Sequence, residues 1–296
     1  MTTPNHIAVI GAGQMGGGIA QVAAVAGINV TVFDSFPGAA DRCQAVHKKS
    51  LAKFVEKGKL SQADMDGALA RIKHVSSLDA LPKDADWIIE AVVENAQVKR
   101  DLFARLAQMY PQEFVVLATN TSSISITEIA AAAGPGGGAG GDSASRVVGM
   151  HFFNPVALMQ LVEVIPAVQT SPAVVERTIK LAERMGKTPL KANDRAGFIS
   201  NRVLMPMINE AFYAWMEGVA EPEAIDGIMK LGCNFPMGPL RLADFIGLDT
   251  CAHIMNVLAE GLNNDRYRPC PLLRQLVTAG RLGDKAGRGV FEYPKK

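Results

Sequence analysis

The chain has 296 residues, of which 48% are hydrophobic and 20% are charged, and its formal net charge is +1. This length is typical of two domains, and the composition allows a substantial hydrophobic core. The near-neutral charge argues against nucleic-acid binding, which uses a concentrated basic surface.

The first predicted elements are typical of a dinucleotide-binding unit. A strand ends at the turn Gly11-x-Gly13-x-x-Gly16, an alanine-rich helix follows, and a second strand ends at Asp34. In such a turn the first glycine permits the sharp bend, the second lets the backbone approach a pyrophosphate, and the third lets the helix pack on the strand. An acid at the position of Asp34 bonds ribose hydroxyls and repels a 2′-phosphate, which favours NAD over NADP. The alternatives are a purely structural turn and a helix N-cap at Asp34.

A helical hairpin is predicted over residues 37–72, because a charged helical pattern is broken at the segment EKGKLSQAD. In the first helix Leu51, Phe54 and Val55 can face inward. The lysines then face outward, either as a solvated surface or as a patch that meets a phosphorylated part of a substrate. These lysines are Lys48, Lys49, Lys53 and Lys57.

Strands and helices continue to alternate up to about residue 155. The runs ADWIIEAVVE, EFVVLATNTSS and RVVGMHFFNP are typical of buried parallel strands, and a helical pattern separates the first two. This alternation predicts an α/β fold with a Rossmann-type doubly wound sheet. The glycine-rich segment 131–145 is predicted to be a flexible surface loop without a catalytic role.

The segment TNTSS places small hydrogen-bonding side chains at the carboxyl end of a strand, where open α/β sheets bind ligands. These side chains serve equally well as caps for the helix that follows, since Ser125 and Glu128 match a capping box. Their position alone leaves both roles open. The residues are Asn120, Thr121, Ser122 and Ser123.

His151 also follows a strand, and Pro155 forces the chain to turn shortly afterwards. A neutral imidazole beside a nicotinamide can accept a hydroxyl proton, and a buried carboxylate can fix the imidazole tautomer. Glu163 lies in the middle of the apolar run LVEVI, where an unpaired carboxylate is costly, so it needs a partner. The two residues are either a catalytic pair or a structural histidine and a separately paired glutamate.

Helical periodicity dominates from about residue 193, so we predict a Rossmann domain at 1–192 and an α-helical domain at 193–296. Asn201 and Arg202 are polar residues in the otherwise apolar first helix of the second domain. Asn201 is expected to donate to a carbonyl in a cleft, or else to make a structural hydrogen bond.

The cysteines are far apart and form no C-x-x-C pair, so we expect neither a disulfide framework nor a metal site, and a reducing compartment fits. No apolar run reaches the roughly 18 residues of a membrane span, and the first residues lack the pattern of a signal peptide. These observations predict a cytoplasmic protein that binds neither membrane nor nucleic acid. The cysteines are Cys43, Cys233, Cys251 and Cys270.

Several motifs, which occur in order over nearly the whole chain, resemble the L-3-hydroxyacyl-CoA dehydrogenase family and especially its short bacterial 3-hydroxybutyryl-CoA dehydrogenases. The motifs are IGAGQMG, EAVVEN followed by VK, TNTSS, HFFNP, LVEVI, GFISNR, GCNFPMGPLRLADFIGLD and GDKAGRGVFEY. The resemblance implies an NAD-dependent oxidoreductase of acyl-CoA or fatty-acid metabolism that interconverts (S)-3-hydroxyacyl-CoA and 3-ketoacyl-CoA. It also implies a homodimer formed through the C-terminal helices.

The resemblance implies roles for individual residues. His151 is the general base and Glu163 supports it. Ser122 contacts the substrate and the cofactor, and Asn201 polarises the reacting oxygen. The implied CoA contacts are Ser50 and Lys57, and the implied NAD contacts are Gly11, Gly13, Gly16, Asp34, Glu94, Lys99, Ser122, Asn154 and Lys285.

The chain departs from the family pattern at Ala196, where a proline is usual, and in the length of the glycine-rich segment. Two other functions remain open. One is a same-fold sugar-acid dehydrogenase of the gulonate type, against which HFFNP and the basic helix argue. The other is a non-catalytic NAD-binding protein of the crystallin type, against which the intact set of implied catalytic residues argues.

Overall fold

A computed structural model describes residues 5–134 and 142–294 of the chain. The chain divides into two compact units, Met1–Asp194 and Arg195–Lys296. The division falls two residues after the predicted end of the Rossmann domain at residue 192. Each unit is described by itself.

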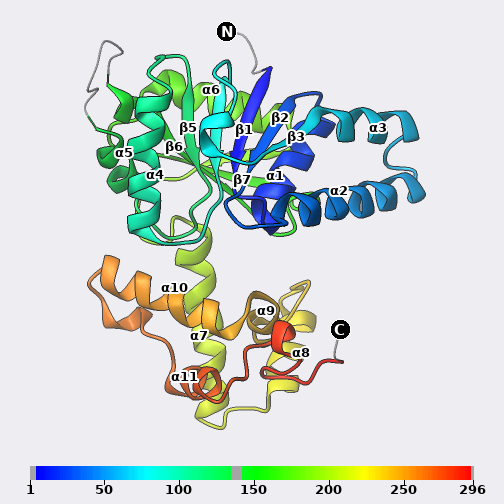
Figure 1. Cartoon of the computed structure of the whole chain (residues 1–296). Helices are drawn as coiled ribbons and strands as arrows, with labels where there is room; N and C mark the ends of the chain where they lie inside the picture. Colours follow the sequence, from blue (N-terminus) through cyan, green and yellow to red (C-terminus); the bar gives the residue numbers. More distant parts are fainter. Residues whose placement is uncertain (1–4, 135–141, 295–296) are drawn as a thin grey trace. The chain divides into compact units, whose positions relative to one another are not determined.

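The described part of the first unit is built on one eight-stranded sheet (Figure 1). Its strands are β1 His6–Ile10, β2 Asn29–Phe33, β3 Ile72–Val75, β4 Trp87–Glu90, β5 Val116–Thr119, β6 Val147–Phe152, β7 Leu161–Pro166 and β8 Thr188–Lys191. They lie in the order β3-β2-β1-β4-β5-β6-β7-β8, and every neighbouring pair is parallel except the antiparallel pair β6–β7. The predicted doubly wound fold is confirmed.

Helices cover both faces of this sheet, which explains why its central strands are apolar on both sides. The helices are α1 Gln14–Val25, α2 Ala39–Glu56, α3 Gln62–Arg71, α4 Ala96–Met109, α5 Ile126–Ala133 and α6 Pro172–Arg184. One buried cluster joins α1, α2, α3 and α6 to the sheet, whereas α4 and α5 pack together against β5 and β6. Figure 1 shows α2 and α3 projecting as the hairpin that the charge pattern predicted.

The structure differs from the sequence predictions in three places. Strand β3 was not predicted, because it is short and carries Lys73 and His74. Strand β8 was not predicted either, since it is short and mostly exposed. The segment 131–145 is not one loop: α5 continues to Ala133, and a 3₁₀ helix spans Ser143–Arg146 with Ala144 buried. Residues 135–141 lie outside the described residues.

The described part of the second unit is helical, as predicted. Its helices are α7 Ser200–Met216, α8 Pro222–Gly232, α9 Pro239–Ile246, α10 Leu248–Gly261 and α11 Pro271–Thr278, and short 3₁₀ helices lie at Asp265–Tyr267 and Asp284–Ala286. The buried carboxylate of Asp244 fastens the tail by accepting hydrogen bonds from Val290 N, Phe291 N and the Tyr293 hydroxyl. Among the described residues no single helix has the length and apolarity to cross a membrane.

Candidate active site

The glycine-rich turn has the geometry that a pyrophosphate needs. Gly11 has φ +103°, and an added Cβ would overlap the carbonyl of Ala91. A Cβ at Gly16 would overlap the Gly11 carbonyl oxygen, so the helix start and the turn are in close contact. A Cβ at Gly13, at the N-cap of α1, would meet no atom within 4 Å. The backbone at Gly13 is therefore open to a ligand, and the free N–H groups of the helix N-terminus suit an anion.

Alanine substitutions at Gly13 and Gly16 should affect different properties, namely NADH binding at Gly13 and folding stability at Gly16. Gly16→Ala should lower the free energy of unfolding by about 1–3 kcal/mol, because the new methyl group must displace backbone. Gly13→Ala should change it by less than about 1 kcal/mol, yet weaken NADH binding about tenfold or more, because the methyl group fills the space for the pyrophosphate. Urea denaturation and NADH fluorescence titration measure the two effects. Normal NADH affinity in Gly13→Ala would contradict this placement of the cofactor.

Asp34 follows β2 and faces a hollow of about 230 Å³. Its carboxylate accepts hydrogen bonds from Ala12 N at 2.7 Å and Phe36 N at 2.8 Å, which tie it to the glycine-rich turn. It does not cap α2, whose N-cap is Gly38. The position beside the turn fits a carboxylate that meets the ribose of NAD.

His151 and Glu163 are in contact. They lie directly opposite each other in the antiparallel pair β6–β7, and His151 Nδ1 is 2.8 Å from Glu163 Oε2. His151 is 7% exposed and Glu163 is 3% exposed. Because a carboxylate only accepts hydrogen bonds, Nδ1 carries the hydrogen in this contact, and in the neutral form of the imidazole the lone pair is then on Nε2. The Phe153 ring packs against the imidazole, with 4.7 Å between ring centroids.

Ser122 lies in a turn whose backbone and hydroxyl groups donate hydrogen bonds to Glu94. Glu94 Oε1 accepts hydrogen bonds from the backbone and hydroxyl groups of Ser122 and Ser123 and from the Thr121 hydroxyl. Its other oxygen is 3.3 Å from the ammonium of Lys99, a buried side chain that also pairs with Glu90.

The environment of Glu94 keeps it ionised. Burial raises the pKa of its carboxyl, but the Lys99 ammonium and the hydrogen bonds from the turn outweigh this effect and leave the pKa below its ordinary value. The stabilisation from this charge is therefore present above the ordinary pKa of glutamate and is lost only as the pH falls through the lowered value.

The helix that follows the TNTSS segment is capped by a residue just after that segment. Ser125 caps α5 by accepting a hydrogen bond from Glu128 N, so this half of the predicted capping box is confirmed. Asn120 instead accepts a hydrogen bond from Phe152 N at 2.8 Å, which ties the end of β5 to the residue after His151. The sequence did not predict the contact between Asn120 and Phe152. It also did not single out the buried Glu90, although Glu90, like Glu163, interrupts an apolar run.

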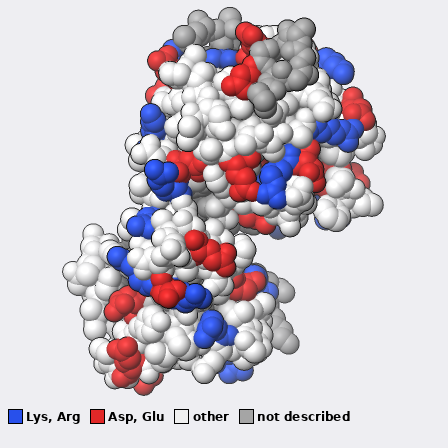
Figure 2. Space-filling view, turned by 90° about the vertical axis from the view of Figure 1, so that its left-hand side faces the viewer, with Lys and Arg blue, Asp and Glu red and all other residues white. Residues whose placement is uncertain are grey.

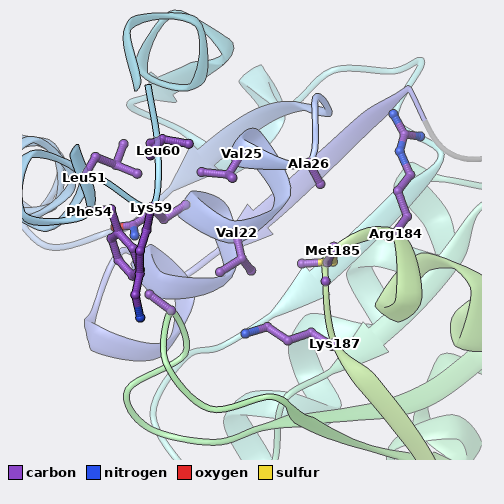
Figure 3. A pocket seen from close by; sticks show the side chains of 13 residues that line it. Val22, Val25, Ala26, Leu51, Phe54, Lys59, Leu60, Arg184, Met185 and Lys187 are labelled. Atoms are coloured by element: carbon purple, nitrogen blue, oxygen red, sulfur yellow. The ribbon is translucent and has the colours of Figure 1, made fainter. Parts of the chain in front are cut away.

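The basic helix α2 borders a pocket of about 500 Å³ (Figure 3). Leu51 and Phe54 of α2 line it together with residues of α1 and of the segment that follows α6. Lys59 and Lys187 add positive charge, and burial lowers the pKa of Lys187. Ser50 accepts a hydrogen bond from Gln21, which lines the pocket. Lys57 is exposed, and neither Ser50 nor Lys57 is among the lining residues.

The remaining predicted residues are found in different surroundings. Asn154 is exposed after β6. Asn201 is buried in the first turn of α7, and Lys285 pairs with Asp249 at 2.7 Å. Asn154 belongs to the first unit, whereas Asn201 and Lys285 belong to the second. Figure 2 shows acidic and basic side chains interspersed on the visible face of the first unit. Within the described residues no group of three or more candidate side chains is arranged to hold a metal ion.

Comparisons with known proteins identify the family to which the two units belong. The family model "3-hydroxyacyl-CoA dehydrogenase, NAD binding domain" matches residues 6–195, and the model of the C-terminal domain of the same family matches residues 197–293. The first model identifies the first unit as an NAD-binding domain, which the open turn at Gly13 fits.

Relatives match over nearly the whole chain. A Deinococcus radiodurans protein named probable 3-hydroxybutyryl-CoA dehydrogenase is 56% identical over 96% of this chain and 99% of its own length. The 3-hydroxybutyryl-CoA dehydrogenase of Bradyrhizobium diazoefficiens is 47% identical over 97% of this chain and 94% of its own. The crystal structure of (S)-3-hydroxybutyryl-CoA dehydrogenase from Ralstonia eutropha has a TM-score of 0.92 at 45% identity, covering 99% of this chain and 100% of that one. The chain therefore belongs to the 3-hydroxyacyl-CoA dehydrogenase family of NAD-dependent oxidoreductases, as its motifs predicted.

Proposed function

We propose that this protein interconverts (S)-3-hydroxybutyryl-CoA and acetoacetyl-CoA with NAD as the hydride carrier, within acyl-CoA or fatty-acid metabolism. The observation that carries the proposal is the contact between His151 and Glu163 at the end of β6, in a unit built to bind NAD. The names of the relatives support the butyryl chain length.

In the proposed reaction His151 Nε2 accepts the proton of the C3 hydroxyl. When bound, NAD supplies the acceptor for the hydride that leaves C3. Glu163 keeps Nδ1 protonated and stabilises the positive charge that the imidazole gains. A general base of this kind contributes roughly 10²–10⁴ in rate, or about 3–5 kcal/mol.

The Ser122 hydroxyl and the Asn201 amide are the proposed donors to the reacting oxygen. Both can donate a hydrogen bond to an oxygen that gains negative charge when a ketone is reduced. On the cofactor side, the backbone of the turn from Gly11 to Gly16 holds the pyrophosphate and Asp34 the ribose. The further proposed cofactor contacts are Glu94, Lys99, Asn154 and Lys285.

The CoA part of the substrate is proposed to lie against α2, with Ser50 and Lys57 as contacts. The pocket beside α2 supports this placement, because it combines apolar walls with lysine ammonium groups (Figure 3). An adenine nucleotide with phosphate groups matches both properties.

Lys57→Ala should raise the KM for acetoacetyl-CoA about fivefold to tenfold, because an exposed phosphate contact is worth about 1 kcal/mol. The KM for the acetoacetyl thioester of pantetheine, which lacks the nucleotide, should stay unchanged. Lys48→Ala is the matched control, since Lys48 is an exposed lysine of α2, the helix that ends just before Lys57. Equal effects of Lys57→Ala on both substrates would mean that Lys57 does not contact the nucleotide.

We also propose that the protein is a cytoplasmic homodimer formed through its second unit. Exposed apolar side chains on and near α7 and α8 support the dimer, because large apolar side chains at the surface are common at association sites. They include Val203, Val219, Ile228 and Leu231. Light scattering should give about twice the 31.5 kDa of one chain, and a monomer at micromolar concentration would contradict the dimer.

The function itself is tested by following NADH absorbance in both directions, with NADH and 3-ketoacyl-CoAs in one assay and with NAD and gulonate in the other. Acetoacetyl-CoA should be reduced, and 3-ketoacyl-CoAs of longer chains should define the acyl-length preference. Oxidation of gulonate without any reduction of acetoacetyl-CoA would favour the sugar-acid dehydrogenase. Tight NADH binding without turnover of any of these substrates would favour the non-catalytic protein.

A further inference from the structure

Glu90 is the innermost charged residue of the candidate site. It is the last residue of β4 and is 0% exposed, and it lies between Ile10 of β1 and Thr119 of β5 in the sheet. Its carboxylate accepts hydrogen bonds from Lys99 Nζ at 2.5 Å, Val92 N at 2.7 Å and the Thr119 hydroxyl at 2.6 Å. Burying a carboxylate at the centre of a sheet is costly, and packing alone does not require it.

Lys99 connects Glu90 to the turn that carries Ser122. Its ammonium is 1% exposed and lies between Glu90 Oε1 at 2.5 Å and Glu94 Oε2 at 3.3 Å. Glu94, with a side chain 28% exposed, is the only one of these three groups that reaches the surface. Two carboxylates share one ammonium, so a change at Glu90 alters how strongly Lys99 attracts Glu94.

The far end of this connection is the Ser122 hydroxyl. The contacts of Glu94 Oε1 with Thr121 Oγ1, Ser122 N, Ser123 Oγ and Ser123 N are 2.6, 2.8, 2.9 and 3.0 Å long. The contact with the Ser122 hydroxyl is the longest of the group, at 3.2 Å. One carboxylate oxygen cannot serve all five donors equally well, so the hold of Glu94 on this hydroxyl is the weakest of the five and depends most on where the carboxylate lies.

We propose that Glu90 is a positioning residue for the reaction: by holding Lys99 it sets the Glu94 carboxylate, which in turn orients the Ser122 hydroxyl. This inference rests on the proposed function only in assuming that Ser122 meets the substrate. Thr119 strengthens the same arrangement, because its hydroxyl bonds Glu90 and accepts a hydrogen bond from Thr121 N. Glu90 thus holds the turn through two separate routes.

The test is a double-mutant cycle between Glu90 and Ser122. Glu90→Gln keeps the shape but removes the charge, so Lys99 pairs with Glu94 alone and draws its carboxylate away from the turn. With acetoacetyl-CoA and NADH, kcat/KM should fall about 10- to 100-fold, the size of effect seen when the residue that orients a metal ligand is removed. In a Ser122→Ala background the same change should cost less than about threefold, because the two residues act through one another.

Arg146→Met is the control for simple loss of stability. Arg146 is also a buried charged residue of this unit, but it bonds Val115 O and Tyr110 O at the opposite end of the strands. It should lower the melting temperature without lowering kcat/KM at temperatures where the variant is folded. If Glu90→Gln does not fold, Thr119→Val takes its place in the cycle, because it removes the hydroxyl that bonds Glu90 and accepts a hydrogen bond from Thr121 N.

The outcomes separate this proposal from the proposed function. Equal losses from Glu90→Gln in both backgrounds, or no loss in either, would overturn the positioning role while leaving the function intact. An equal loss of kcat/KM in folded Arg146→Met would overturn it as well. Full activity of Ser122→Ala would overturn both the role of Ser122 and the positioning role. A folded wild-type protein that does not reduce acetoacetyl-CoA would overturn the proposed function itself.

Discussion

His151→Gln should lower kcat for acetoacetyl-CoA reduction by about 10²–10⁴, because the amide cannot exchange a proton with the reacting oxygen. The dissociation constant for NADH should stay within about twofold, since the glycine-rich turn and Asp34 lie on other elements. Steady-state kinetics and NADH fluorescence titration measure the two quantities on the same preparation.

His6→Gln is the matched control for this variant. His6 is a partly buried histidine of the same unit, but it opens β1 at the amino ends of the parallel strands, where it contacts Thr31 at 2.9 Å. Its replacement should leave kcat unchanged. Full turnover in His151→Gln would remove His151 from the reaction.

Glu163→Gln should lower kcat by about 10² or more while the protein remains folded. The amide can donate to Nδ1 instead of accepting from it, which moves the imidazole hydrogen to Nε2 and removes the lone pair that accepts the proton. The free energy of unfolding should also fall by about 1–3 kcal/mol, because a buried hydrogen bond to a charged group is weakened. Kinetics and urea denaturation test both expectations.

Glu128→Gln provides the comparison for Glu163→Gln. Glu128 is a partly exposed carboxylate on α5 that pairs with Arg100. Its removal should change neither kcat nor stability by a large amount, since exposed ion pairs contribute little. A Glu163→Gln variant with the kinetics of Glu128→Gln would make the contact with His151 purely structural.

The sequence was most informative where a residue conflicted with its surroundings. Glu163 in an apolar strand required a partner, and the structure supplies His151. The sequence could not give the pairing itself, because the contact depends on an antiparallel register that sets residue 151 opposite residue 163. Register depends on the whole sheet, and local patterns do not determine it.

The same reasoning applied to WIIEAVV would have identified Glu90 as a second buried carboxylate. The apolar residues around Glu90 predict a buried strand, but this prediction alone does not identify the partners of the carboxylate. The role of Asn120 could not be foreseen in this way, since its partner is the backbone of Phe152, 32 residues away. Backbone partners leave no trace in side-chain patterns.

Two further differences between the sequence predictions and the structure concern strand β3 and Asp34. Strand β3 pairs with β2 although its sequence, IKHV, alternates apolar and polar residues over only four positions. Pairing with β2 stabilises β3 as a strand, although the sequence of β3 alone does not predict one. Conversely, Asp34 looked like a possible helix cap, but α2 begins only after Gly38.

The most direct test of the proposed reaction follows the hydride. The protein should be incubated with acetoacetyl-CoA and NADH deuterated at both hydrogens of nicotinamide C4, and the product examined by mass spectrometry. One deuterium should appear at C3 of 3-hydroxybutyryl-CoA in the wild-type protein. A product without deuterium, or no product from folded protein that binds NADH, would contradict direct hydride transfer at this site.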